Sequence, residues 1–235
     1  MAPTCEKQAT EGYHPPSANA APSGLLMTAC PVPDRSIVEA KRALRAEAAA
    51  RRRAAVAALP PALAGAKLRD VFLSAIALPP GVPVSGYWPL EAEIDPRPLI
   101  QHLHDAGHPI GLPVVLGPGR PLCFRRWHPG MALEQGSFRV LVPPADAQEL
   151  IPAVVLAPLL AFDAAGYRLG YGGGFYDRTI AKLRAAGPVL CIGIAYAAQE
   201  VEAVPREATD QPLDWIVTER EARRIGDADA GGKRC

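Results

Sequence analysis

The chain has 235 residues, of which 49% are hydrophobic and 21% charged, and its formal net charge is +1. This length and apolar content allow one sizeable hydrophobic core. A net charge so close to zero gives no field that would attract nucleic acid or an anionic membrane surface, so we expect small-molecule ligands and no nucleic-acid or membrane partner.

Cysteine usage and hydropathy indicate a compartment. The five cysteines, at positions 5, 30, 123, 191 and 235, are odd in number and too widely spaced for a zinc knuckle or a compact disulfide framework. The longest apolar stretch, residues 151–162, contains Pro158 and is shorter than the roughly 20 residues that span a bilayer. These features predict a soluble cytoplasmic protein with reduced thiols. We also expect a monomer.

The first 35 residues differ in composition from the rest. They are rich in Ala, Pro, Ser and Thr, and they lack both hydrophobic periodicity and the pattern of a signal peptide. We therefore predict a disordered tail over residues 1–35, one α/β domain over residues 36–222 and a flexible tail over residues 223–235. Met27 is an alternative start codon.

A first helix is predicted from residue 36. Ser36-Ile-Val-Glu39 has the form of a capping box, and Lys41 and Arg45 then lie one turn apart on the same helix face. Two cations so placed could contact one anionic group, or they could belong to a solvated basic face. The solvated face is the interpretation we adopt for the three arginines at positions 51–53.

A β-run, an acidic loop and a second helix follow. The run over residues 84–88 ends at Pro89, and the helix is expected over residues 96–106. Acids at positions 91, 93 and 95 either begin this helix or bind a ligand, since a carboxylate suits a heterocycle rich in N–H donors. Trp88 is either a core residue or a stacking surface. His102, His104 and His108 are only a weak metal pattern, because Gly107 should end the helix.

A glycine-rich loop lies between Gly166 and Arg178. The glycines at positions 170, 172, 173 and 174 can adopt positive φ and leave backbone N–H groups uncovered. The apolar spacing after them predicts a helix that ends at Gly187, so an anion could bind at the helix N-terminus. Asp177 in the first turn would complement the helix dipole or, beside phosphates, hold Mg²⁺. An ordinary glycine turn is the alternative.

The whole pattern predicts one three-layer α/β domain with a mainly parallel sheet flanked by helices. Short apolar runs near residues 83–88, 109–115, 153–158, 189–194 and 214–218 alternate with helical segments. Ligands of such sheets bind at the carboxyl ends of the strands, where the loops after residues 88 and 158 should meet. The side of the sheet on which Asp214 lies is left open.

The order of these segments resembles the 5-formyltetrahydrofolate cyclo-ligase (methenyltetrahydrofolate synthetase) family. The motif Arg168-Leu-Gly-Tyr-Gly-Gly-Gly-Phe-Tyr-Asp177 is similar to the family's ATP-binding stretch. Four further blocks, Lys41–Arg45, Val84–Asp95, Val154–Asp163 and Thr209–Glu219, follow the family's order. The resemblance implies ATP- and Mg²⁺-dependent cyclisation of 5-formyltetrahydrofolate to 5,10-methenyltetrahydrofolate, and the absence of Walker A, zincin and nucleophile-elbow motifs agrees with it.

The resemblance also implies residue roles. ATP would be bound by Lys41, Arg42, Arg45, Arg168, Leu169, Gly170, Tyr171, Gly172, Gly173, Gly174, Phe175 and Tyr176. Lys41, Arg45, Arg168 and Tyr176 would act in catalysis, Trp88, Glu93, Tyr171 and Phe175 would contact the folate, and Asp177 and Asp214 would bind Mg²⁺. Phe138 is a further residue that would cover the folate.

Three positions depart from the family pattern. Tyr171 replaces an Arg found in some members, Gly173 replaces a Lys, and Leu159 replaces a Gly that a positive-φ turn would use. Two alternatives therefore stay open. One is a paralogue with the same nucleotide site and another substrate, and the other is a non-catalytic sensor of a phosphorylated metabolite.

Overall fold

The computed structural model describes residues 35–90 and 92–226. Most of both predicted tails, Met27 and Glu91 lie outside the described residues, so the predictions for them stay untested. The predicted domain boundary at residue 222 falls on the first residue of the last strand, β11 (Ala222–Arg224). No helix in the described part of the chain is long and apolar enough to cross a membrane.

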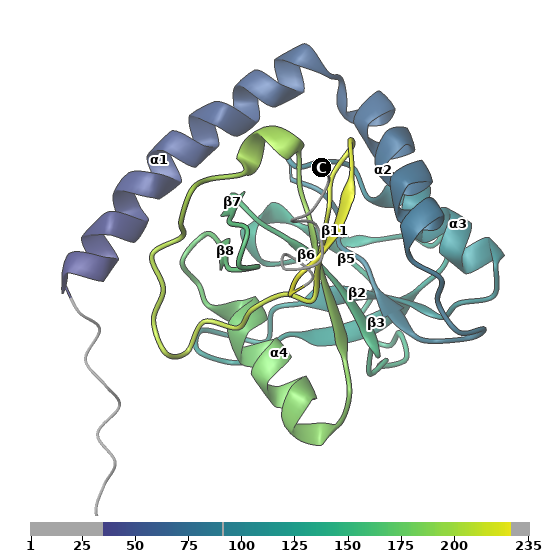
Figure 1. The fold of residues 1–235 in the computed structure, drawn as a ribbon. Helices are drawn as coiled ribbons and strands as arrows, with labels where there is room; N and C mark the ends of the chain where they lie inside the picture. Colours follow the sequence, from purple (N-terminus) through teal and green to yellow (C-terminus); the bar gives the residue numbers. More distant parts are fainter. Residues whose placement is uncertain (1–34, 91, 227–235) are drawn as a thin grey trace, which may run out of the picture. The chain divides into compact units, whose positions relative to one another are not determined.

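Seven strands of the described chain form one sheet, in the order β11-β10-β9-β6-β1-β2-β3 (Figure 1). Its five central strands pair in parallel and match the five predicted runs: β1 (Val84–Ser85), β2 (Ile110–Val114), β6 (Val154–Pro158), β9 (Leu190–Ile194) and β10 (Trp215–Val217). The edge strands β3 (Cys123–Trp127) and β11 pair antiparallel and were not predicted. The prediction of a mainly parallel sheet is confirmed.

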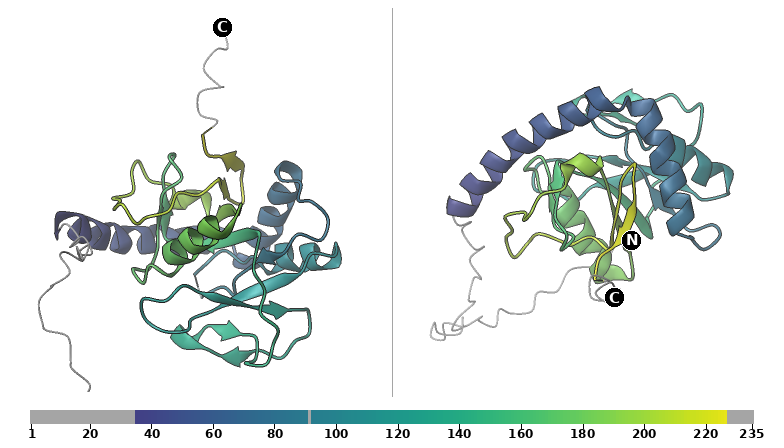
Figure 2. Two further views of the ribbon diagram at one scale, coloured as in Figure 1. Left: turned by 90° about the horizontal axis from the view of Figure 1, so that it is seen from below. Right: turned by 45° about the horizontal axis from the view of Figure 1, so that its top comes forward.

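Helices cover both faces of this sheet (Figures 1 and 2). On one face, α2 (Pro61–Ala75) and α3 (Arg97–Asp105) pack against Val154 and Leu156 of β6; on the other, α4 (Phe175–Ala186) packs against Val155 and Ala157. Successive residues of a strand point to opposite faces, so one apolar run supplies both layers. The three-layer prediction is confirmed, and α2 is a helix that the sequence analysis missed.

The long first helix, α1 (Arg35–Ala58), begins where the capping box predicted. Its buried residues are Lys41, Ala48 and Arg52, which recur at helical spacing on one face. Ala48 and Leu44 pack against the small β7–β8 sheet (Ala161–Phe162 and Arg168–Leu169) and Val204. The buried face of α1 is therefore charged at both ends, and its two buried cations need partners in the domain.

The remaining elements are short. The β4–β5 hairpin (Glu134–Gln135 and Leu141–Val142) encloses the 3₁₀ turn η1 (Ser137–Arg139), and η2 (Ala197–Gln199) follows β9. Phe138 and Arg139 in η1 have φ of 56° and 61°, and they are the described non-glycine residues with positive φ. Leu159 is not among them. Its buried side chain packs over Gly193, where an added Cβ would lie 2.9 Å from Leu159 Cδ2.

Candidate active site

The glycine loop connects β8 to α4. Gly172 and Gly174 have φ of 101° and 62°, a region that favours glycine, whereas Gly170 and Gly173 do not. Gly174 is the residue directly before α4, so the loop presents the helix N-terminus, as predicted. An added Cβ at Gly173 would lie 2.6 Å from the Phe175 ring. The prediction of positive φ therefore holds at two of its four positions, and at a third, Gly173, a side chain would displace the Phe175 ring.

This loop borders a cavity of about 550 Å³. The cavity is lined by the end of β1, the acidic loop, η1 with its hairpin, the glycine loop and the first turn of α4. Eleven of the predicted site residues line it: Trp88, Glu93, Phe138, Arg168, Gly170, Tyr171, Gly173, Gly174, Phe175, Tyr176 and Asp177. The segments predicted to meet at the carboxyl ends of the strands therefore do meet.

Two carboxylates of the acidic loop, Asp95 and Glu93, make different contacts. Asp95 accepts hydrogen bonds from the backbone N–H and the guanidinium of Arg97 at 2.7–2.9 Å, and so it serves the start of α3. Glu93 instead lines the cavity and is 5% exposed, and its Oε2 accepts the Leu90 N–H at 2.8 Å. Burial raises the pKa of Glu93, although the Leu90 N–H, Tyr171 and Arg52 act to lower it.

Glu93 is connected to α1 through a tyrosine. The Tyr171 hydroxyl donates to Glu93 Oε1 at 2.8 Å and accepts from Arg52 Nη1 at 2.7 Å. The Arg52 guanidinium also stacks on the Tyr171 ring, 5.5 Å from its centroid, and Nη1 lies 3.9 Å from Glu93 Oε1. Interpreting Arg52 as part of a solvated face was therefore wrong. Its spacing of eleven residues from Lys41 and seven from Arg45 was a signal that it shares their face.

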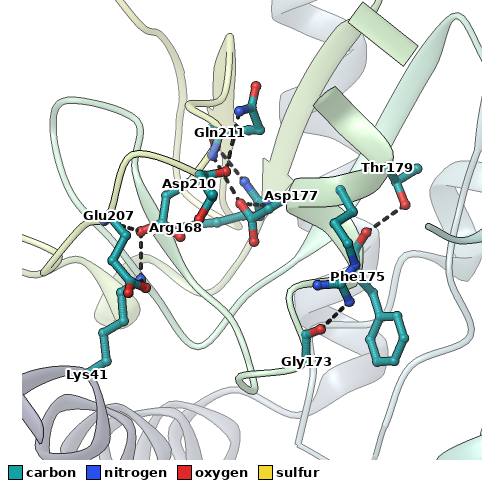
Figure 3. A network of polar contacts seen from close by, with 11 residues as sticks. Lys41, Arg168, Gly173, Phe175, Asp177, Thr179, Glu207, Asp210 and Gln211 are labelled. Atoms are coloured by element: carbon teal, nitrogen blue, oxygen red, sulfur yellow. Dashed lines mark hydrogen bonds and ion pairs between the residues drawn. The ribbon is translucent and has the colours of Figure 1, made fainter. Parts of the chain in front are cut away.

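Arg168 in β8 and Asp177 in the first turn of α4 form an ion pair across the glycine loop (Figure 3). Arg168 Nη2 donates to Asp177 Oδ1 at 2.8 Å, and Arg168 Nη1 donates to the Gln211 carbonyl at 2.7 Å. The same Oδ1 accepts the Gln211 N–H at 3.1 Å. Within the described residues Oδ2 of Asp177 accepts no hydrogen bond, so this oxygen is available to a further ligand.

Lys41 extends from α1 to the segment before Gln211 (Figure 3). Its Nζ lies 2.8 Å from Glu207 Oε2 and 2.7 Å from Asp210 Oδ2. Burial acts to lower the pKa of Lys41, but the hydrogen bonds that it donates to Asp210 and Glu207, with the charges of these carboxylates, outweigh this and raise it. The ammonium is therefore held by two carboxylates, and one of them, Asp210, directly precedes the Gln211 that contacts Arg168 and Asp177. The sequence analysis missed Glu207 and Asp210 as partners.

Two further arginines contact the glycine loop. Arg45 Nε donates to the Gly170 carbonyl at 3.0 Å, and an added Cβ at Gly172 would lie 3.4 Å from its guanidinium carbon. Arg178, in the first turn of α4, donates to the Gly173 carbonyl and stacks on Phe175. Arg178 was not predicted. Arg42 is exposed to solvent, and Leu169 contributes a buried side chain to the packing against α1.

Aromatic rings border the cavity. Phe138 is 70% exposed, and its ring meets Phe175 edge to face at a centroid distance of 6.0 Å. Trp88 meets Trp127 at 6.3 Å and is stacked by Arg97. Burial, with the Glu93 charge, raises the pKa of Tyr176, so its hydroxyl stays protonated and can donate into the cavity.

Asp214 lies away from this site. Its Oδ2 accepts the Cys191 N–H at 2.7 Å near the amino end of β9, and Arg184 in the last turn of α4 lies 3.3 Å away. Asp177 is in the first turn, seven residues or about 10 Å earlier along the helix axis. The structure therefore does not bring the two predicted metal ligands together. Among the described residues no three His, Cys, Asp or Glu side chains cluster as a metal site, the three histidines included.

Comparison with known proteins decides the family. The model of the 5-formyltetrahydrofolate cyclo-ligase family matches residues 37–219. The chain belongs to this family. The predictions of family, α/β fold and ligase-class enzyme are thus confirmed.

Several cyclo-ligases are similar to the chain over most of their own length. The 5-formyltetrahydrofolate cyclo-ligase of Escherichia coli K12 is 37% identical over 143 residues, which cover 57% of this chain and 76% of that protein. The Haemophilus influenzae cyclo-ligase is 37% identical over 133 residues, 54% of this chain and 70% of that one.

Solved structures agree in fold. The 5,10-methenyltetrahydrofolate synthetase of Aquifex aeolicus has a TM-score of 0.61 and 28% identity, covering 85% of this chain and 95% of that one. The synthetase of Mycoplasma pneumoniae has a TM-score of 0.60 at 21% identity, covering 77% and 99%. The second comparison supports the fold alone.

Proposed function

We propose that the chain converts 5-formyltetrahydrofolate to 5,10-methenyltetrahydrofolate, with ATP as co-substrate, Mg²⁺ as the metal ion, and release of ADP and phosphate. Membership of the cyclo-ligase family supports this proposal. The single observation that supports it most is that one cavity is lined both by a buried carboxylate, Glu93, and by a glycine loop at a helix N-terminus. The first suits a donor-rich heterocycle and the second a polyphosphate.

The folate would bind at the Glu93 end of the cavity. An ionised carboxylate can accept two parallel N–H hydrogen bonds from a pterin ring, and Trp88, Phe138 and Phe175 supply apolar surface. The Tyr171 hydroxyl points to Glu93, so in this proposal Tyr171 contacts the folate more than the phosphates. Because Tyr171 stands where some family members have an Arg, other residues would have to neutralise the charge of the phosphates.

The ATP phosphates would bind over the glycine loop. Arg45 and Arg178 contact the loop carbonyls, and Arg168 pairs with Asp177 in the first turn of α4, so three cations contact the loop or the helix start. Lys41 pairs with Glu207 and Asp210 and is the fourth cation of this proposal. In the ligand-free protein each of these groups has a protein partner. Phosphate oxygens would take over some of these hydrogen bonds, which is favourable because bonds to charged acceptors are strong.

The residues present fit Mg²⁺ at Asp177. Mg²⁺ binds through one or two carboxylates plus substrate phosphate oxygens, and Asp177 Oδ2 is available next to the loop. In this proposal Asp210 would be the second carboxylate, because it directly precedes Gln211, whose N–H contacts Asp177, although its Oδ2 pairs with Lys41 in the ligand-free protein. When bound, the ion would neutralise charge on the transferring phosphoryl group. We assign Asp214 a structural role instead.

The reaction needs alignment more than a protein nucleophile. The formyl oxygen of the folate attacks the γ-phosphorus, the bond from that phosphorus to the β–γ bridging oxygen breaks, and ADP leaves. N10 then attacks the activated formyl carbon, the C–O bond to phosphate breaks, and the N10 proton leaves with the phosphate. Lys41, Arg45 and Arg168 would hold the phosphates, Glu93 would fix the ring, and the protonated Tyr176 hydroxyl would donate to the reacting oxygens.

One assay tests the proposal. Purified protein is mixed with 5-formyltetrahydrofolate, ATP and Mg²⁺, and methenyltetrahydrofolate absorbance and ADP release are followed together. We expect one ADP per product, dependence on Mg²⁺, and loss of turnover in Asp177→Ala. Folded protein that gives no product would contradict the proposal.

A changed substrate is the second candidate, and the Tyr171–Glu93 contact favours it because a tyrosine at a position where some family members have Arg bonds the carboxylate proposed to bind the folate. In that case ATP would bind without product formation, and Glu93→Ala would leave turnover of the true substrate intact. Binding of a phosphorylated metabolite without Mg²⁺ would instead support a sensor. The cytoplasmic location, the monomeric state and the domain boundaries stay predictions from the sequence.

A further inference from the structure

Two buried, oppositely charged side chains from distant parts of the chain meet through one hydroxyl. The side chains of Arg52 in α1 and Glu93 in the acidic loop are 9% and 5% exposed. Their closest atoms are 3.9 Å apart, beyond hydrogen-bonding distance, and the Tyr171 hydroxyl closes the gap with bonds of 2.7 and 2.8 Å. The glycine loop thus supplies the hydroxyl oxygen, that of Tyr171, which links Arg52 of α1 to the Glu93 carboxylate.

Arg52 has few other partners. In the described chain its guanidinium donates one hydrogen bond, to Tyr171, and its buried Nε has none. A buried cation is costly unless an opposite charge offsets it, and the carboxylate beside Arg52 is Glu93, 3.9 Å away. Each oxygen of Glu93 is fixed by one donor, Oε2 by the Leu90 N–H and Oε1 by the Tyr171 hydroxyl. Arg52 holds that hydroxyl and supplies the positive charge, so it acts on both the direction and the charge state of Glu93.

We propose that Arg52 and Tyr171 are positioning residues that keep Glu93 ionised and aimed into the cavity, and that Tyr171 makes folate recognition depend on the conformation of the glycine loop. This inference rests on the proposed function. A carboxylate oxygen can accept more than one hydrogen bond, so Tyr171 can remain bound while the pterin N–H groups contact Glu93. Since Tyr171 belongs to the loop over which ATP would bind, a change in loop conformation would move the donor that fixes this acceptor.

The electrostatics around Glu93 agree with this role. The groups that face it are Arg52 from α1, Tyr171 from the glycine loop, Tyr176 from α4 and Tyr87 from the end of β1, with Asp95 on its own loop near Tyr87. Arg52 is the charged group among them that favours the ionised form. Burial raises the pKa of Glu93, whereas Arg52 and the Tyr171 hydroxyl lower it. A protonated carboxyl is a weaker acceptor. Removal of Arg52 or of the Tyr171 hydroxyl should therefore raise the pKa further, and folate binding should weaken at a higher pH than in the unchanged protein.

The test uses Arg52→Met and Tyr171→Phe, with Arg53→Met as a matched control because Arg53 is the exposed neighbour in the same helix. We expect the KM for 5-formyltetrahydrofolate to rise about tenfold in Tyr171→Phe, as for loss of a hydrogen bond to a charged group, and less in Arg52→Met, because Arg52 lies 3.9 Å from Glu93 and acts on it through Tyr171. The KM for ATP should change less than twofold. The acid limb of kcat/KM for the folate should move to higher pH, and Arg53→Met should match the unchanged protein.

A measurement in the ligand-free protein separates this inference from the proposed function. The pKa of the Glu93 carboxyl is followed by ¹³C NMR and assigned by its absence in Glu93→Gln. A higher pKa in Arg52→Met and Tyr171→Phe supports the positioning role even if the protein does not turn over the folate. An unchanged Glu93 pKa and an unmoved acid limb would overturn it. So would a lower folate KM in Tyr171→Phe, since the tyrosine would then be a competitor for Glu93.

Discussion

At the scale of single residues, sequence order alone does not separate neighbouring carboxylates. Glu93 and Asp95 lie two positions apart in the same loop, and both were candidates for helix capping or ligand binding. The structure assigns Asp95 to Arg97 and the start of α3, and Glu93 to the cavity. The difference depends on Tyr171 and Arg52, which are distant in sequence. The family resemblance selected Glu93 for a reason that the local pattern did not contain.

Asp177 and Asp214 give a matched pair of carboxylates for mutagenesis. We expect Asp177→Asn to lower kcat at least a hundredfold, because the variant keeps the acceptor for Arg168 but loses the charge on the available oxygen. Asp214→Asn should keep kcat within a few-fold and cost roughly 1–3 kcal/mol of stability, because it weakens the contacts with Arg184 and the Cys191 N–H.

Steady-state kinetics at several Mg²⁺ concentrations and urea unfolding measure the two effects. Loss of activity in Asp214→Asn that is rescued by high Mg²⁺ would show that Asp214 binds the metal after all.

At the scale of elements, the regular periodicities were predictable and the special conformations were not. The capping box gave the start of α1, and a terminal glycine helped to give α3 and α4 within a few residues. The face of α1 was misassigned at Arg52 because a buried arginine looks like a solvated one in sequence. The positive φ of Phe138 and Arg139 had no signal, since neither residue favours that region.

In the η1 turn, Phe138 is expected to lower the stability of the fold and to strengthen folate binding. Phe138 is held at a φ of 56° with its ring exposed, which costs about 1 kcal/mol relative to glycine at the same position. We expect Phe138→Gly to keep or raise the melting temperature while raising the KM for the folate several-fold, because the ring over Phe175 is lost.

The matched control is Ile151→Gly, at an apolar residue that is 80% exposed and outside the cavity lining. It should leave KM unchanged. An equal KM for Phe138→Gly and the unchanged protein would mean that the ring does not touch the substrate.

At the scale of the whole molecule, the central sheet was predictable because its strands are buried on both sides. Such strands are continuous apolar runs, and β6 and β9 are of this kind. The edge strands β3 and β11 each contain two arginines, of which Arg126 and Arg224 are exposed, and therefore resemble loops in sequence. The helix α2 was missed for the related reason that its apolar residues do not form a clear stripe beside its prolines.

The buried thiol of Cys191 gives the fold a dependence on alkaline pH. Burial raises the pKa of Cys191 to about 11, from an ordinary value of 9. Below pH 9 the thiol is protonated in both states, and between pH 9 and 11 the unfolded chain loses this proton first. Stability should therefore fall as pH rises through this window, by up to roughly 1.4 kcal/mol per pH unit for this one group.

Cys191→Ala should flatten the decline, measured by urea unfolding at pH 8, 9 and 10. Cys123→Ala is the comparison variant and should flatten it less, because Cys123 is only half-buried. The same slope in Cys191→Ala and the unchanged protein would exclude Cys191 as its source.

The double ion pair of Lys41 has a consequence for ionic strength. If its ammonium moves to a phosphate of ATP, it must first leave Glu207 or Asp210, so dissolved salt acts on both sides of that exchange. Screening weakens the attraction to ATP, and it also weakens the internal pairs that compete with ATP. The affinity for ATP should therefore fall less steeply with added KCl than its number of cations suggests. Glu207→Gln, which removes one competitor, should bind ATP more tightly at low salt and show the steeper decline.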